Sequence, residues 1–365
     1  MFDAFSSFMW RSRAKYLDRV GEGLDRAYAE AEVETHRFDN TRMVIFSDLH
    51  RGTGDRADDF RPCRKIYHAA LGYYGSLDFR LFLLGDIEEL WERLIGTIVG
   101  QYESTLKLEK QFFDRGAAVR FVGNHDESLA WPWNRSVIER FINGQPLREG
   151  LIIRLVDSAD RPIGELFFVH GHQGIHYSWF DRFVVKRLWA PIQRLSGITV
   201  GMPSSDHSIR LLHEQALYEW ARQRKDLLLV CGHTHHPVFM STAWEQTVRD
   251  ELEALRATDA SREAIAMKEA QLNWVAADLD EMKSALPEDA RPCYFNTGCC
   301  SFQDGSITGI EIVDGRIRLV RWSGESGSPR RQALREADLA NILGRCQNGV
   351  CSLQGPDASS AEELG

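Results

Sequence analysis

Regularly spaced cysteines and long apolar runs are both missing from this sequence. The 365 residues include 7 Cys, an odd number without the spacing of a disulfide framework, which indicates a reducing compartment such as the cytoplasm. No apolar run reaches the roughly 18 residues that span a bilayer, and no cationic segment followed by an apolar one opens the chain. We therefore expect a cytoplasmic protein, at most peripheral to the inner face of the membrane.

An excess of basic residues is missing as well. The formal net charge is -9, with 44 Lys and Arg against 53 Asp and Glu, which disfavours a general nucleic-acid-binding protein. No basic track with interleaved aromatic residues marks the surface of a nuclease. A local basic pocket for a phosphate group is still compatible with this charge. With 43% hydrophobic residues, the chain is long enough to bury the core of one large α/β domain or two small ones.

Short apolar runs alternate with longer amphipathic stretches along most of the chain. Each run ends abruptly in polar residues, which is typical of buried strands followed by loops and helices. This alternation predicts an α/β fold around a sheet. The runs are Met43–Ser47, Phe79–Leu84, Val119–Val122, Leu166–Val169 and Leu227–Cys231, with later candidates at Cys293–Asn296, Ile307–Ile312 and Ile317–Trp322.

Three regions flank or interrupt this pattern. Residues 1–40 carry apolar residues at helical spacing and predict a helical extension that docks on the main domain, residues 41–323. Within that domain, two apolar series predict a helical hairpin inserted at 244–287, which offers a surface for a protein partner or for self-association. Residues 324–365 are polar and predict a largely disordered tail with one short helical patch near Glu336 to Leu343.

Polar residues collect directly after the first five strands. Because strands of one open sheet bring their carboxyl ends to one edge, we expect these clusters to converge. Seven of the twelve His lie in the clusters or beside them. The clusters read SDLH from Ser47, GD from Gly85, GNHD from Gly123, HGH from His170 and GHTH from Gly232.

The chemistry of these clusters predicts a catalytic metal site. One Asp or His at a strand end is usually a hydrogen-bonded cap, but five such clusters would be costly to bury without a cation. Asp48 and His50, two residues apart on an extended segment, can grip one ion, and His233 and His235 repeat that geometry. Oxygen and imidazole ligands without thiolates suit Mn, Fe, Zn or Co better than Ca.

The ordered motifs from residue 44 to residue 236 resemble those of the calcineurin-like metallophosphoesterase superfamily. The resemblance implies a β-sandwich flanked by helices and a centre of two divalent metal ions, with Mn as the first expectation and Fe, Zn or Co as alternatives. It implies that Asp48, His50, Asp86 and His235 hold one metal, and that Asn124, His170 and His233 hold the second together with a bridging Asp86.

The same resemblance implies the reaction. Two cations about 3.5–4 Å apart would lower the pKa of a shared water, and the resulting hydroxide would attack phosphorus in line. His125 matches the family's His near the leaving group, which does not bind metal, and could protonate the leaving oxygen. Glu89 or Asp126 is the candidate carboxylate that orients it. His172, the second His of HGH, could face the substrate.

For the substrate, the sequence indicates one type and leaves several alternatives open. Leu84–Trp91 resembles a segment of the UDP-2,3-diacylglucosamine hydrolase type, which cleaves a nucleotide-lipid pyrophosphate. His125, where that branch carries Arg, instead matches the broader phosphatases and phosphodiesterases, so small-molecule esters and cyclic nucleotides are alternatives. A non-catalytic scaffold of the same fold is another.

Residues outside the ligand motifs could contact the substrate or a membrane. Arg51 and Arg56 could clamp a substrate phosphate or be solvated at the surface. The basic amphipathic stretch 178–195 and the first 13 residues could touch an anionic membrane, although core packing explains either pattern as well. The pair Trp131 and Trp133 could stack a base or pack as a pocket wall.

Overall fold

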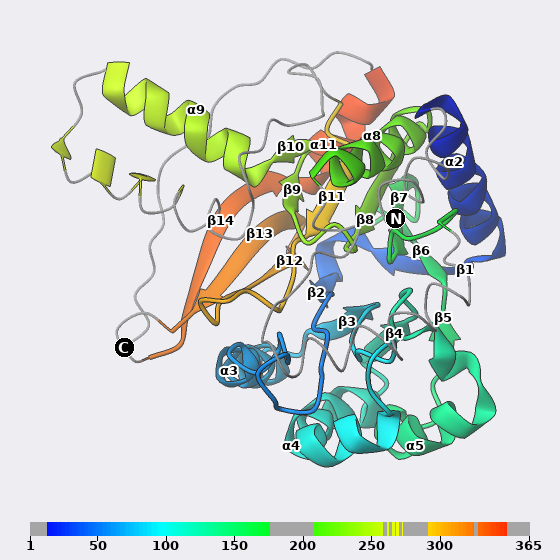
Figure 1. The fold of residues 1–365 in the computed structure, drawn as a ribbon. Coiled ribbons are helices and arrows are strands. Elements are labelled where there is room, and N and C mark those ends of the chain that lie inside the picture. Colours follow the sequence, from blue (N-terminus) through cyan, green and yellow to red (C-terminus); the bar gives the residue numbers. More distant parts are fainter. Residues whose placement is uncertain are drawn as a thin grey trace.

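Two seven-stranded sheets form the centre of the protein. The computed structural model describes residues 13–175, 207–257, 261–262, 265–266, 268–269, 272, 291–324 and 328–348. In Figure 1 the two sheets lie between two groups of helices, α2, α8 and α11 on one side and α3, α4 and α5 on the other. Among the described residues, no helix combines the length and the apolar composition needed to cross a membrane.

The first sheet contains the strands that supply the HGH and GHTH motifs. β7, β8 and β11 are parallel, β6 is antiparallel to β7, and β1 joins β6 in parallel. The sheet order is β1 (Glu32–Arg37), β6 (Gly150–Val156), β7 (Pro162–Val169), β8 (Leu227–Cys231), β11 (Tyr294–Thr297), β9 (Pro237–Phe239) and β10 (Thr242–Ala243).

The second sheet contains the strands that supply the other three motifs. β2, β3, β4 and β5 are parallel, whereas β12, β13 and β14 pair antiparallel at the other side of β2. The sheet order is β14 (Arg330–Asp338), β13 (Arg316–Ser323), β12 (Ile307–Val313), β2 (Arg42–Phe46), β3 (Arg80–Leu84), β4 (Ala118–Phe121) and β5 (Leu147–Arg148).

The central strands are apolar along their whole length because both of their faces are covered. In β2, Met43 and Ile45 pack with residues of the first sheet, whereas Val44 and Phe46 pack with α3 and α4. This alternation follows from the two-residue period of a strand. Parallel strands covered on both faces read as continuous apolar runs, which is why the sequence pattern located them.

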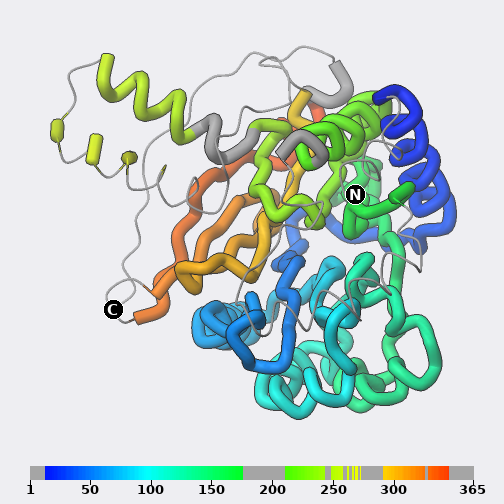
Figure 2. The backbone as a smooth tube through the Cα atoms, viewed as in Figure 1, coloured from blue at the N-terminus to red at the C-terminus, as the bar shows by residue number. Residues whose placement is uncertain are grey.

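Helices cover the outer faces of both sheets. The tube in Figure 2 shows α2 and α8 side by side beside the first sheet, and α4 and α5 together beyond the second. The helices are α2 (Arg13–Glu30), α3 (Arg64–Ser76), α4 (Ile95–Asp114), α5 (Pro132–Ile142), α8 (His207–Arg222), α9 (Trp244–Ala257) and α11 (Leu339–Asn348), with short 3-10 turns η1 (Phe38–Asn40) and η2 (Glu127–Ala130).

The α/β class with two sheets flanked by helices is confirmed, and all eight predicted strands are present. The five motif-bearing strands divide between the two sheets of this sandwich, β2, β3 and β4 in one and β7 and β8 in the other. The N-terminal extension holds the predicted helix but also β1. The prediction of a largely disordered tail is wrong for residues 330–338, which form β14, whereas α11 overlaps the helical patch that the sequence predicts near Glu336 to Leu343.

The inserted hairpin is described only in part. Its first arm is α9, in which Val248 and Leu252 are buried as the apolar series predicts. Residues 273–290, which hold most of the expected second arm, lie outside the described residues, as do the stretch 178–195 and the first 12 residues.

Candidate active site

The five polar clusters meet at one edge of the sandwich, between the two sheets. Backbone hydrogen bonds join the loops after β2 and β3, where the amides of Asp48 and His50 donate to the carbonyls of Gly85 and Asp86 at 3.1 and 3.0 Å. The loop after β8 is joined to them because the amide of His233 donates to the Asp48 carboxylate at 3.0 Å. The site therefore spans both sheets.

Most of the predicted ligands have a left-handed backbone. The φ angles are 52° at Asp48, 48° at His50, 53° at Asp86, 69° at His233 and 59° at His235. A non-glycine residue in this region costs on the order of 1–3 kcal/mol and persists only where the surroundings enforce it. The left-handed conformation turns these side chains away from the strand direction, so that their ligand atoms lie close together.

Gly123 permits the closest approach between two of these loops. A Cβ atom at this position would overlap the carboxylate of Asp86, so only glycine allows the loop after β4 to reach that side chain. The amide of His125 then donates to Asp86 Oδ1 at 2.8 Å. This contact leaves Asp86 Oδ2 directed at the cluster.

Asp86 lies at the centre of the cluster. Its Oδ2 atom is 3.1 Å from His170 Nε2 and 3.9 Å from His50 Nε2, so it faces both halves of the predicted ligand set. Ligand atoms lie within 4.8 Å of one another in the groups Asp48–His50–His235, His50–Asp86–His125 and Asp86–His170–His233. This placement is the one that a bridging carboxylate would require.

The polar atoms of the cluster fit a pair of cations. His50 Nε2 and His235 Nε2 face each other at 3.0 Å, with Asp48 Oδ1 at 3.3 Å from the latter. Asn124 Oδ1 and His170 Nε2 are buried without a hydrogen-bond partner. Buried polar atoms without partners are costly, and a metal ion would supply the missing interaction for each of them.

Neighbouring acceptors fix which imidazole nitrogen carries the proton. Charge from His125 and hydrogen bonds outweigh burial and lower the pKa of Glu89 to about 2, so its carboxylate only accepts. His50 Nδ1, at 3.1 Å from Glu89 Oε2, must therefore donate. His170 Nδ1 donates to the Leu84 carbonyl at 2.8 Å. In both histidines Nε2 is thereby the nitrogen that faces the cluster, which is the arrangement found in metal-binding histidines.

The pKa shifts agree with a cluster rich in negative charge. Burial alone would raise the pKa of Asp86, but the neighbouring imidazoles of His170 and His125 hold it well below its usual range. Burial and nearby imidazoles lower the pKa of His233 well below its usual value, so this ring is neutral. Although burial opposes the shift, Asp86 raises the pKa of His170 to about 9 and Asp48 raises that of His235 well above its usual value, so a bound divalent metal would displace protons from these two rings.

His125 is held by a carboxylate and an indole. Its Nδ1 lies 2.7 Å from Glu89 Oε2, and its ring stacks on Trp91 at a centroid distance of 4.1 Å and an interplanar angle of 16°. Although burial opposes it, the charge of Glu89 raises the pKa of His125 to about 9. Nε2 is left to face a substrate. Trp91 was missed as a site residue because only the fold places its ring on His125.

Two of the predicted roles are wrong. Asp126 does not orient His125, because its carboxylate accepts from the amides of Ile87 and Gly123 at 2.9 and 2.7 Å; Glu89 fills that position. Arg51 does not face the substrate, because its fully buried guanidinium donates to Glu88 and Glu109 at 2.7 and 2.9 Å. Both residues instead belong to a buried ionic network beneath the site.

The remaining predicted residues are exposed or partly buried. Arg56 is exposed in the turn after the first ligand pair. His172 is partly buried with its ring centroid 5.3 Å from that of His170, and burial lowers its pKa to about 3. Trp131 and Trp133 are 51% and 65% exposed. Their roles stay predictions.

Comparison with known proteins identifies one family, and two solved structures are distantly similar. A family model described as calcineurin-like phosphoesterase matches residues 41–237. Vacuolar protein sorting 29 from Cryptosporidium parvum is 12% identical with a TM-score of 0.35, and the match covers 82% of this chain and 98% of that one. A single mutant of Vps29 from Entamoeba histolytica is 13% identical with a TM-score of 0.32, over 82% and 99% of the two chains. No curated protein matches this sequence.

Proposed function

This chain belongs to the calcineurin-like phosphoesterase family, and on that premise we propose that it is a hydrolase of phosphate esters that uses two divalent metal ions. The observation that carries the proposal is the convergence of five other predicted ligands on the groups that contain or adjoin Asp86, namely Asp48, His50, His170, His233 and His235. Manganese is our first choice of metal because the ligand set contains no thiolate. When bound, two such ions polarise phosphoryl oxygens and make a water nucleophilic at neutral pH.

The residues divide into two sets that share Asp86. Asp48, His50 and His235 form the first set, in which the two imidazole nitrogens face each other at 3.0 Å. Asn124, His170 and His233 form the second, and the two unpartnered atoms Asn124 Oδ1 and His170 Nε2 both lie in it. With Asp86 shared, each set would supply four ligands to its ion.

His125 supplies the proton for the leaving group. In hydrolysis a water oxygen forms a bond to phosphorus, the bond from phosphorus to the ester oxygen breaks, and that oxygen takes a proton. A pKa of about 9 keeps the His125 imidazolium protonated at neutral pH, so Nε2–H can donate to the leaving oxygen. Glu89 fixes the ring through Nδ1, and Trp91 holds its plane.

The finer proposal is a substrate with an apolar part, such as a nucleotide-lipid pyrophosphate of the UDP-2,3-diacylglucosamine type. The parallel order of β3, α4, β4 and α5 brings the N-termini of both helices to the metal edge. There Leu94, Trp131 and Trp133 are 77%, 51% and 65% exposed. An apolar group beside the reacting phosphate would cover them. Small-molecule phosphodiesters, phosphomonoesters and cyclic nucleotides are the alternative substrates.

Metal analysis and a substrate panel test the proposal. We expect about two equivalents of Mn in the reconstituted protein and turnover of a chromogenic phosphodiester. The panel compares UDP-diacylglucosamine, cyclic nucleotides, phosphomonoesters and single-stranded DNA. Protein that binds no metal and turns over no ester would overturn the enzyme reading in favour of a scaffold. Turnover of cyclic nucleotides but not of UDP-diacylglucosamine would retain the enzyme and overturn the lipid substrate.

A further inference from the structure

Two adjacent residues of α8 each hold one of the loops that carry the second set of ligands. His213 Nε2 lies 2.6 Å from the carbonyl oxygen of Gly171, which follows ligand His170. Glu214 Oε1 lies 2.9 Å from Nδ1 of His236, which follows ligand His235. Both α8 side chains are buried, with 2% and 0% exposure. One helix turn thereby joins the loop after β7 to the loop after β8.

A tyrosine of the N-terminal helix fixes His213 in turn. Because the Gly171 carbonyl can only accept, His213 Nε2 carries the proton and Nδ1 must accept. The hydroxyl of Tyr16, on α2, donates to that Nδ1 at 2.6 Å. α2 also touches the loop after β7 directly, since a Cβ atom at Gly174 would overlap the carbonyl of Arg19. α2 lies outside the residues that the family model matches.

The ring of His213 reaches ligand His233 as well. The two rings meet edge to face, with centroids 5.0 Å apart and planes at 74°. His233 and His235 both have the left-handed backbone that costs free energy unless the surroundings enforce it. Three contacts from α8 supply such enforcement. The His213 ring packs against His233, Glu214 bonds His236 in the same loop, and His213 bonds Gly171 in the loop after β7.

We propose that α8 and α2 form a positioning clamp for the second metal, in which Tyr16, His213 and Glu214 set the separation of His170 and His233. The proposal rests on the proposed two-metal centre but concerns metal affinity, which is measured without turnover. None of the three residues touches a substrate, so they are positioning residues. Supporting residues behind metal ligands commonly change metal affinity by about 10–100-fold.

Five variants of the full chain test the clamp. His213→Leu removes the donor to Gly171, and His213→Gln keeps a donor of similar reach. Tyr16→Phe removes only a hydroxyl, and Glu214→Gln weakens the bond to His236. Tyr28→Phe is the matched control, because it also removes a tyrosine hydroxyl from α2. That hydroxyl donates to Glu165 at 2.5 Å, away from the ligand loops. Each protein is titrated with Mn and then melted.

We expect His213→Leu to weaken the second Mn about 10–100-fold while the first Mn binds as in the wild type. His213→Gln should recover most of the affinity, Tyr16→Phe and Glu214→Gln should lose a smaller part, and Tyr28→Phe should lose none. If His213→Leu fails to fold, the affinity of Tyr16→Phe for the second Mn tests the clamp instead. A lowered melting temperature with wild-type affinity for both Mn ions would overturn the clamp, because the residues would then serve stability alone.

The same titration separates this proposal from the proposed function. Wild-type protein that binds no Mn would overturn both. Wild-type protein that binds two Mn but hydrolyses no ester would overturn only the proposed catalysis, and the variants would still report on the clamp.

Discussion

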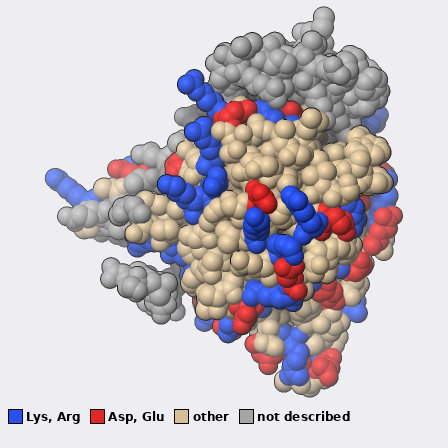
Figure 3. Space-filling view, turned by 90° about the horizontal axis from the view of Figure 1, so that it is seen from below, with Lys and Arg blue, Asp and Glu red and all other residues tan. Residues whose placement is uncertain are grey.

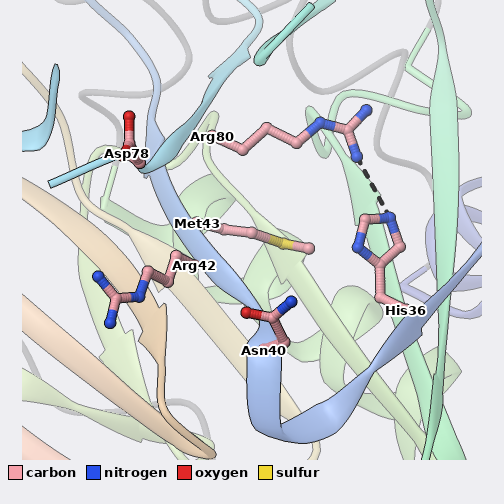
Figure 4. Close-up of a pocket in the computed structure, with 6 residues that line it drawn as sticks. All are labelled: His36, Asn40, Arg42, Met43, Asp78 and Arg80. Atoms are coloured by element: carbon pink, nitrogen blue, oxygen red, sulfur yellow. Dashed lines mark hydrogen bonds between the residues drawn. The ribbon is translucent and has the colours of Figure 1, made fainter.

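The strands β2 and β3 carry polar side chains at both of their ends, and the two ends differ in how those side chains are satisfied. At the carboxyl ends lie Asp48 and Asp86, with the metal cluster. At the amino ends, Arg42 and Arg80 line a cavity of about 390 Å³ together with His36, Asn40, Met43 and Asp78 (Figure 4).

Charges at the amino ends are paired with each other. Glu34 accepts from both terminal nitrogens of Arg80, and Arg42 lies 3.7 Å from Asp314. Asp78 lies 3.3 Å from Arg115. The face in Figure 3 shows the same pairing where charges occur, because Lys and Arg side chains lie next to Asp and Glu toward its right and lower edge, whereas much of the remaining described surface is tan. Such pairs at the surface add little stability and leave no atom waiting for a ligand.

The metal end has the opposite arrangement. Nitrogen and oxygen lone pairs face one another there, two of them are buried without a partner, and the backbone that presents them is strained. The number of charged residues therefore does not distinguish a catalytic edge from an ordinary one. Unshared lone pairs do distinguish it, whereas left-handed backbone alone does not, because Asp78 and Asp314 at the amino ends also have φ angles of 57° and 51°.

Removing the carboxylate at the centre of the cluster should have the largest effect. In Asp86→Ala both ligand sets lose their shared oxygen, so we expect Mn content to fall well below two equivalents and turnover to fall to background. Asp78→Ala, at the amino end of the same strand, is the control and should keep both. Two equivalents of Mn in Asp86→Ala would contradict its bridging role.

Removing the proton donor should slow the reaction without removing the metals. In His125→Ala we expect turnover to fall about 10²–10⁴-fold, the usual contribution of a general acid, while Mn content stays unchanged. Metal analysis beside steady-state kinetics provides the measurement. His125 lies within reach of His50 and Asp86, so a stoichiometric loss of Mn would identify it as a ligand.

Breaking the buried network beneath the site should change stability rather than substrate binding. Arg51→Met removes the charge that Glu88 and Glu109 share, leaving Glu88 with Arg120 and Glu109 with the Tyr67 hydroxyl, and removing one member of a buried ion pair typically costs about 3–5 kcal/mol. Urea unfolding measures the loss. KM of the folded variant should equal that of the wild type. Arg56→Met, at an exposed position, is the comparison and should leave the free energy of unfolding unchanged. A KM that is raised in Arg51→Met but not in Arg56→Met would show that Arg51 contacts the substrate after all.

Altering the opposite end should have the smallest effect. A hydrogen bond from His36, opposed by burial and aided by Arg80, lowers the pKa of Glu34. Its stabilising contribution is therefore present at neutral pH and lost as the pH falls through that lowered pKa. Glu34→Gln should cost no more than about 1 kcal/mol at pH 7 and leave turnover unchanged. The free energies of unfolding of the variant and the wild type should converge as the pH is lowered. A difference that grows in acid would contradict the pairing of Glu34.

Local patterns were sufficient to predict the strands and the ligands. Val44, Phe82 and Leu229 stand in continuous apolar runs, and each ligand follows such a run within a few positions, so sequence neighbours carry the information. Local patterns do not predict the structural roles of Arg51 and Asp126, because their partners Glu88, Glu109 and Arg120 come from other elements.

The structured tail and the supporting residues were missed for related reasons. β14 is a charged strand at a sheet edge, stabilised mainly by backbone pairing with β13, and its residues resemble a solvated segment. His213 and Tyr16 stand alone in helical sequence. Only the packing of α2 on α8 brings them to the ligand loops.

Glu89 accepts from both His50 and His125 through one oxygen atom. A substitution there disturbs a metal ligand and the proton donor together, so evolution cannot adjust metal affinity and leaving-group chemistry independently at this position. A descendant that lost Glu89 would need two compensating changes at once to recover activity.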